Sequence, residues 1–184
     1  MTSFEYVSVL LSIVIAIALA HLLTAIARMF EHGVVNFSIP LAQWIGFCLF
    51  LCVDHWFQVW RLSGQSSWTL AFVLQLLLQA SLIYLACYLV VPSSTTDRTL
   101  DMTAFFNTSR KKFMGVILFL AVTNEILNLS LPGFGSLHVG LLVFSWIVLL
   151  SVGIVSSSLK IQHLLAGINV LLTVHYAVTF IPKL

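Results

Sequence analysis

The chain has 184 residues, of which 60% are hydrophobic and only 8% are charged, and its mean hydropathy is +1.09. Soluble domains are about one-quarter charged, so this composition excludes an ordinary water-soluble domain. The formal net charge of +2 is too small for a nucleic-acid-binding surface. The sequence therefore predicts a single transmembrane domain over residues 1–184, with membrane lipids as partners and no nucleic acid.

Six apolar runs have the length of about 20 residues that a helix needs to cross a bilayer. They are continuous rather than alternating, which indicates helices and not the strands of a barrel, because backbone groups in hydrocarbon need internal partners. The four prolines all fall at or beside the ends of these runs. The predicted fold class is all-α, a polytopic bundle of six transmembrane helices spanning about 5–28, 40–61, 68–91, 113–131, 137–158 and 160–181.

The basic residues are unevenly divided between the two ends of these spans. Cytoplasmic loops carry an excess of Lys and Arg, so the end with more of them is predicted to face the cytoplasm. This rule puts both the N-terminus and the C-terminus outside in a multi-pass topology. The inner side would hold Arg28, Arg98, Arg110, Lys111, Lys112 and Lys160, and the outer side Arg61 and Lys183.

The longest loop, residues 92–112, ends in an aromatic and basic stretch, TLDMTAFFNTSRKKF. Phe105 and Phe106 precede three successive basic residues, Arg110, Lys111 and Lys112. This order predicts a short amphipathic helix on the inner surface, with its Phe side at the acyl boundary and its basic residues on lipid headgroups. The alternative is a solvated loop whose charges only set topology.

Three features resemble a family of small, functionally uncharacterised bacterial inner-membrane proteins. They are the opening FEYVSVLLSIVIAIALAHLLTAIARMF, the series Trp44, Trp56, Trp60 and Trp68, and the loop from Pro92 that ends in RKKF. The resemblance covers roughly the first two thirds of the chain. It implies the bacterial inner, or cytoplasmic, membrane. Its motifs are hydrophobic and aromatic, so it carries no known active residue.

The polar residues inside the spans fall at a common depth in the outer half of the membrane. With a rise of about 1.5 Å per residue, Asp54, Glu125 and His175 all lie about 19–22 Å above the inner boundary. Gln75, on a descending span, reaches nearly the same level. The prediction is a polar pocket open to the outer side, formed by Asp54, His55, Gln58, Arg61, Gln75, Glu125, Asn128 and His175.

Asp54, Gln58 and Arg61 are spaced i, i+4 and i+7, which places them in one stripe on the second span. An acid that faces lipid costs about 2.5–3.5 kcal/mol on insertion scales, so the stripe should face the bundle. We expect Asp54 to be paired with Arg61, His55 or His175, close to Glu125.

A second, thinner layer is predicted near the inner face. His21 and His163 each lie about 5–6 Å from the inner boundary, and Arg28 follows His21 by seven residues on the same helix face. A single histidine in a membrane helix is more often a packing residue than a ligand or a proton relay. Two at one depth leave both interpretations open.

Three functions are compatible with these patterns, and no motif typical of an enzyme is present. The leading prediction is a transport or channel protein in which the pocket moves protons, cations or a small solute. One alternative is a membrane haem-b protein, with His21 and His163 as one axial pair and His55 and His175 as the other. The twelve-residue spacing of His163 and His175 puts them on different helix faces and counts against haem.

The other alternative is a non-catalytic scaffold or assembly subunit, in which buried polar groups only fix helix packing. Cys48, Cys52 and Cys87 are interpreted as small buried residues, because no second Cys pair completes a metal site. No cofactor or metal is therefore predicted outside the haem alternative. Gly153 and Ser157 form a small-xxx-small pair that allows close packing within the bundle or in a homo-oligomer.

Overall fold

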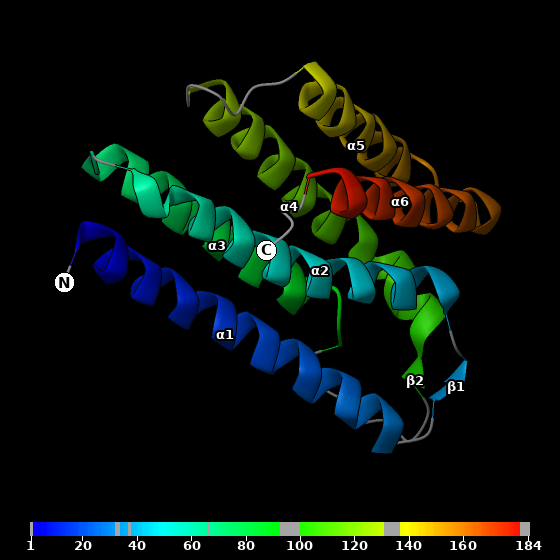
Figure 1. The fold of residues 1–184 in the computed structure, drawn as a ribbon. Coiled ribbons are helices and arrows are strands. Elements are labelled where there is room, and N and C mark those ends of the chain that lie inside the picture. The colour runs from blue at the N-terminus through cyan, green and yellow to red at the C-terminus, as the bar shows by residue number, and fades with distance from the viewer. Residues whose placement is uncertain are drawn as a thin grey trace.

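The computed structural model describes residues 2–31, 34–36, 38–65, 67–92, 100–130 and 137–180. Within these ranges the chain forms six α-helices, a short 3-10 turn and two very short strands (Figure 1). In chain order the elements are α1 (Ser3–Glu31), β1 (Val34–Asn36), α2 (Ile39–Arg61), the 3-10 turn (Leu62–Gly64), α3 (Leu70–Leu89), β2 (Leu100–Asp101), α4 (Met102–Ser130), α5 (Leu137–Val155) and α6 (Leu159–Phe180).

Helices α1, α2, α3, α5 and α6 are long and apolar enough to cross a membrane. Helix α4 is as long as α1, but it includes three successive basic residues and is not among these five. The predicted all-helical class is confirmed, and the apolar helices are those of a membrane protein.

The predicted short surface helix is not a separate element. The stretch from Met102 to Lys112 continues without interruption into the apolar segment that follows, as one 29-residue helix. The helix begins there because the Asp101 carboxylate accepts hydrogen bonds from the backbone N–H groups of Thr103 and Ala104, 3.0 and 3.1 Å away. No proline falls between Asp101 and Ser130 to end it.

The helices pack with α1 and α5 on opposite sides of the bundle (Figure 1). Helix α1 lies on one side against α3 and α2, and α5 lies on the other side against α4 and α6. Helices α2, α3 and α4 stand between them, and α6 packs on α2 and α5. Helix α1 buries one stripe of side chains spaced three or four apart, namely Val7, Leu11, Ile15, Ala18, Leu22, Ala25 and Met29.

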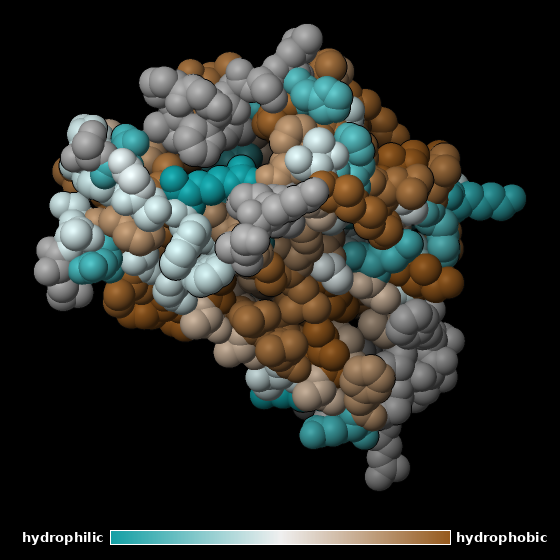
Figure 2. Space-filling view, viewed as in Figure 1, coloured by the Kyte–Doolittle hydropathy of each residue, from teal (hydrophilic) through white to brown (hydrophobic). Residues whose placement is uncertain are grey.

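The outer surface of the bundle is apolar. Figure 2 shows hydrophobic side chains over a broad part of the face in view, with hydrophilic ones at its edges and at several places between. Large side chains such as Phe30, Leu70, Phe144, Leu171 and Val178 are more than 60% exposed. Exposed apolar patches of this kind mark surfaces that water does not cover, and in this chain they suit lipid.

Contacts between helix ends show that successive helices run in opposite directions. Strands β1 and β2 pair in parallel, which brings the start of α2 and the start of α4 to one end of the bundle. At the same end, Arg110 near the start of α4 contacts Gly153 near the end of α5. At the other end, Arg61 in the last turn of α2 donates a hydrogen bond to the carbonyl of Phe180, which ends α6.

The three cysteines lie in the interface between α2 and α3. All are buried, and the Sγ atoms of Cys52 and Cys87 are 3.7 Å apart. Cys48 is one turn before Cys52 on α2, and it also interacts with Cys87. This cluster fixes which faces of the two helices meet.

The packing of α2 on α3 predicts a specific disulfide. In a Cys48→Ser variant in liposomes, iodine should oxidise Cys52 and Cys87 to a disulfide, releasing two iodide ions and two protons. The adjacent thiols need only approach from van der Waals contact to bonding distance. Mass spectrometry of the digested protein should identify the linked peptides.

A variant with Cys48 and Cys87 both replaced by Ser serves as the control and should show no intramolecular link. If Cys52 and Cys87 both stay reactive to maleimide after iodine treatment and denaturation, the packing of α2 on α3 is wrong.

Candidate functional site

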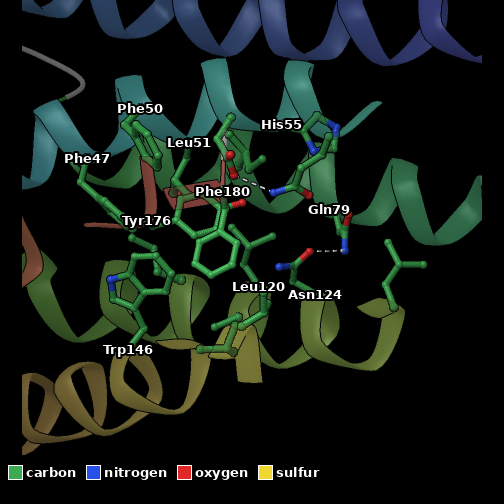
Figure 3. A pocket seen from close by; sticks show the side chains of 18 of the residues that line it. Phe47, Phe50, Leu51, His55, Gln79, Leu120, Asn124, Trp146, Tyr176 and Phe180 are labelled. Carbon is green, nitrogen blue, oxygen red and sulfur yellow. Dashed lines mark hydrogen bonds between the residues drawn. The ribbon is translucent and has the colours of Figure 1, made fainter. Parts of the chain in front are cut away.

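A cavity of about 140 Å³ lies between α2, α3, α4, α5 and α6. Helix α1 contributes nothing to its lining. Figure 3 shows aromatic rings gathered on one side of the cavity, from α2, α5 and α6, and polar side chains from α2, α3 and α4 toward the other. The cavity therefore has an aromatic wall and a polar wall.

Asp54 on α2 is the acidic group of this lining. It is 7% exposed, and its Oδ2 accepts a 2.6 Å hydrogen bond from Nε2 of Gln58, one turn further along the helix. The Tyr176 side chain of α6 also interacts with the carboxylate. A buried carboxylate needs such donors, because it has left the hydrogen bonds of water.

Arg61 stands at the rim of the cavity. It is exposed, and its guanidinium donates to the carbonyl of Phe180. Its positive charge acts on Asp54 from there. The predicted partners of Asp54 were Arg61, His55 or His175, whereas the structure places Gln58 and Tyr176 beside the carboxylate.

His55 lies between the cavity and α1. The side chain is 3% exposed, and it also borders a small gap lined by Leu11, Ser12 and Ile15. Its Nε2 atom is buried without a hydrogen-bond partner. Most buried polar atoms are paired, so an unpaired ring nitrogen at a cavity wall marks a place where a water or a ligand would be stabilised.

Helices α3 and α4 contribute amide side chains to the polar wall. Gln79 donates a 3.3 Å hydrogen bond to Oδ1 of Asn124, and both line the cavity (Figure 3). Gln75, one turn before Gln79, donates to the carbonyl of Thr123 at 3.0 Å and does not reach the lining. These bonds hold α3 and α4 together.

Two more of the predicted pocket residues, besides Gln75, face elsewhere. Glu125 is not part of the lining, because its side chain lies against α5, where a Cβ on Gly140 would be 3.4 Å from Oε1. His175 is exposed and lies beside His138, with ring centroids 6.1 Å apart. The side chain of Asn128 lies outside the described residues.

Sequence reasoning missed Gln79, Asn124 and Tyr176 as cavity residues. Asn124 and Tyr176 are the immediate neighbours of Glu125 and His175. Successive residues point about 100° apart around a helix. A prediction that has the right depth but the wrong helix face therefore names the residue next to the one that lines the cavity. Gln79 had a usable signal, since it lies four residues after Gln75 on the same face of α3.

The predicted inner layer is not assembled. His21 stacks on Tyr88 of α3, with ring centroids 5.0 Å apart, and its Nε2 is buried without a partner. His163 is exposed, and its Nδ1 lies 2.7 Å from the carbonyl of Leu159 on its own helix. Helix α1 packs on α2 and α3, whereas α6 packs on α2 and α5, so the two histidines face different neighbours. Arg28 is exposed.

The predicted haem ligand pairs are likewise separated. His21 has Tyr88 as its ring neighbour, and His175 has His138. His55 borders the cavity and the small gap beside α1. Among the described residues, no ring contact joins the two members of either predicted axial pair.

The predicted headgroup cluster divides into a buried residue and two exposed ones. Arg110 is only 4% exposed, and its guanidinium donates to the carbonyls of Gly153, at 2.7 Å, and Ser156. Nε2 of Gln162 donates to the same two carbonyls, at 3.0 and 2.8 Å. A cation at a helix C-terminus satisfies its last carbonyls and complements its dipole. Arg110 therefore joins α4 to the end of α5, and Gln162 brings α6 to the same carbonyls, while Lys111 and Lys112 are exposed and can contact lipid.

Comparison with family models, curated proteins and solved structures gives no match for this chain. A fold hosts many functions, so what the site can do has to be argued from its own chemistry. That chemistry is a buried carboxylate with the Gln58 amide as its donor and Tyr176 nearby, an unpaired imidazole nitrogen and an aromatic wall around a small cavity.

The position of Arg110 predicts a large effect on stability. Arg110→Ala should lower the free energy of unfolding by about 2 kcal/mol, because charge-assisted hydrogen bonds to two buried carbonyls are lost. Unfolding in mixed micelles of increasing denaturing detergent, followed by circular dichroism, measures the change. Lys112→Ala is the matched control and should stay within about 0.5 kcal/mol, since its side chain is exposed. Equal effects of the two variants would contradict the assignment of Arg110 as a helix-joining residue.

Proposed function

We propose that this chain is a six-span protein of the bacterial inner membrane whose outward-facing cavity binds and moves protons, cations or a small solute. The observation that carries the proposal is Asp54, an acid buried inside a membrane bundle and lining a cavity. Ionisable residues within membrane helices are costly to insert, and they commonly mark pathways for ions, protons or substrates.

The antiparallel order of the helices supports the six-span topology. The first residues of α1 and the last residues of α6 belong to the same end of the bundle, the end where Arg61 contacts Phe180. The opposite end carries Lys111, Lys112 and Lys160, and by the positive-inside rule it is cytoplasmic. Both termini are then outside.

In this orientation the cavity opens outward and is closed below. Arg61, Leu62 and Phe180, which line it, all lie at the outer helix ends. On the inner side Trp44, fully buried, makes edge contacts with Phe47 and Phe113, with ring centroids 5.7 and 5.5 Å apart. These rings form an inner barrier between α2 and α4, and transport would require them to separate.

A scaffold function is the second candidate, and specific bonds favour it. Gln79 with Asn124, and Trp146 with Asn169 at 3.1 Å, join neighbouring helices directly. Interhelical hydrogen bonds in a membrane average about 0.6 kcal/mol, which is enough to fix helix register without any transported substrate. The two candidates differ over Asp54, because packing alone does not require a carboxylate at a cavity wall.

The proposed topology predicts opposite sidedness for two reporter fusions. A fusion after Ser94 should report the cytoplasm and one after Leu184 the periplasm, because an odd number of spans separates the two points. Paired alkaline phosphatase and green fluorescent protein reporters measure both outcomes. Matching sidedness would mean a miscounted span and would overturn the outward-facing cavity.

The proposed transport predicts that Asp54 controls flux. In proteoliposomes with an entrapped pH-sensitive dye, Asp54→Asn should lower proton flux by about tenfold or more, equivalent to losing one charge-assisted interaction. Glu125→Gln is the matched control, since it removes an intramembrane acid that does not line the cavity. It should retain the flux of the parent protein.

The scaffold candidate predicts the other result. Proton flux that is unchanged in Asp54→Asn, or missing from the parent protein, would remove the support for proton transport. A loss of flux in both variants would mean that Glu125 belongs to the pathway and that the cavity alone does not define it.

A further inference from the structure

We infer that the cavity recognises a small alkylammonium cation, held by the Asp54 carboxylate and a wall of aromatic rings. The inference rests on the proposed function, because it names the substrate class of the same cavity. It depends on three features of the lining: the arrangement of its rings, the position of its single acid, and the scarcity of oxygen ligands.

The aromatic wall is continuous across three helices (Figure 3). Trp146 of α5 lies 6.2 Å from Phe47 of α2 and 5.7 Å from Tyr176 of α6, measured between ring centroids. Tyr176 in turn lies 6.2 Å from Phe50 and 5.6 Å from Phe180. All five rings line the cavity. Their faces and edges provide the surface on which a weakly hydrated cation is stabilised by the ring quadrupoles.

The charge of the lining has the sign that a cation requires. Asp54 is one helical turn beyond Phe50, and its carboxylate is next to Tyr176, so it belongs to the border between the aromatic and polar walls. The basic residue of the lining, Arg61, is at the rim and donates to the carbonyl of Phe180. An anion would be repelled by the Asp54 carboxylate inside the cavity, and the positive charge that would attract it, Arg61, lies at the entrance.

The lining suits an organic cation better than a metal ion. Ca²⁺ takes about six to eight oxygen ligands, and Mg²⁺ demands a complete octahedron. Around Asp54 the structure offers one carboxylate, the Gln58 amide and the Tyr176 hydroxyl. The polar wall adds the His55 ring and the Gln79 and Asn124 amides, which bond to each other, and the rest of the described lining is mainly aromatic and aliphatic. An alkylammonium ion needs one countercharge and apolar contact for its methyl groups. Its size also fits, since a cavity of about 150 Å³ accepts benzene and this one measures about 140 Å³.

Choline and its uncharged carbon isostere, 3,3-dimethylbutan-1-ol, test the inference directly. Equilibrium binding to the purified protein in lipid nanodiscs should show saturable binding of choline and binding of the neutral alcohol at least about tenfold weaker, because only the charge differs between them. Asp54→Asn should remove this preference. Titration calorimetry measures both compounds under the same conditions.

Variants of the aromatic wall separate ring contact from general damage to the fold. Trp146→Leu should weaken choline binding by about tenfold, while Trp146→Phe should retain most of it, because the ring face remains and only the hydrogen bond to Asn169 is lost. Trp56→Leu is the matched control, since Trp56 is half exposed on the outer surface of α2 and does not line the cavity. Circular dichroism and gel filtration verify that each variant is folded.

The outcomes distinguish this inference from the proposed function. Equal binding of choline and the neutral alcohol, or choline binding unaffected by Asp54→Asn, overturns the alkylammonium site. Proton flux that depends on Asp54 in a protein that binds no choline also overturns it, but leaves the proposed transport intact. Choline binding that depends on Asp54 and Trp146 supports the site. This holds even if the protein shows no proton flux and the proposal of proton transport is lost.

Discussion

A carboxylate inside a lipid bilayer has to find its donors within the protein, and the arrangement around Asp54 follows from that constraint. One donor, Gln58, is supplied by the same helix one turn away, so it is present whenever α2 is formed. The Tyr176 side chain, which also interacts with the carboxylate, comes close only when α6 packs on α2. The contact between Arg61 and Phe180 joins the same two helices at their outer ends. The burial of Asp54 is therefore coupled to the packing of α6 on α2.

The same constraint explains the opposite end of the bundle. Helix α5 ends near Gly153 and Ser156, and its last carbonyls have no intrahelical donors. Arg110 from α4 and Gln162 from α6 supply them, so a basic residue that the sequence suggests is bound to headgroups is instead drawn into the protein. Little contact with lipid headgroups is lost when Arg110 is buried, because Lys111 and Lys112 stay exposed at the membrane surface. Helix ends are where backbone groups lack partners, and at this one Arg110 and Gln162 provide them.

The sequence predicts the membrane helices well, because they depend on composition. It predicts poorly which face of each helix points into the cavity, because that depends on how the helix is rotated about its axis. Hydropathy identifies the helices because every backbone group in lipid has to be satisfied within its own segment. Depth is also readable, since rise per residue is constant. It identified the level of Asp54, and the i, i+4 and i+7 stripe added Gln58 and Arg61, and all three line the cavity. Rotation of one helix relative to another is set by packing between segments far apart in the chain. For α4 and α6, where no stripe as clear as that of α2 exists, the neighbouring residue turned out to face the cavity.

The end of an element is equally hard to predict when no breaker marks it. The basic cluster before Phe113 reads as a surface segment, yet Asp101 caps a helix that runs straight through it.

The continuity of α4 carries a mechanical consequence. Phe113, which packs on Trp44 in the inner barrier, is only three residues from Arg110, which is fastened to the end of α5. A rigid helix transmits rotation along its length, so in the proposed transport α4 would move together with α5 against α2, and the cavity between them would change shape. The aromatic wall spans the boundary between these helices, since Trp146 on α5 contacts Phe47 on α2. A ligand seated on that wall therefore contacts both sides of the boundary, and a difference in its affinity for the two arrangements is the only means by which it can drive the change.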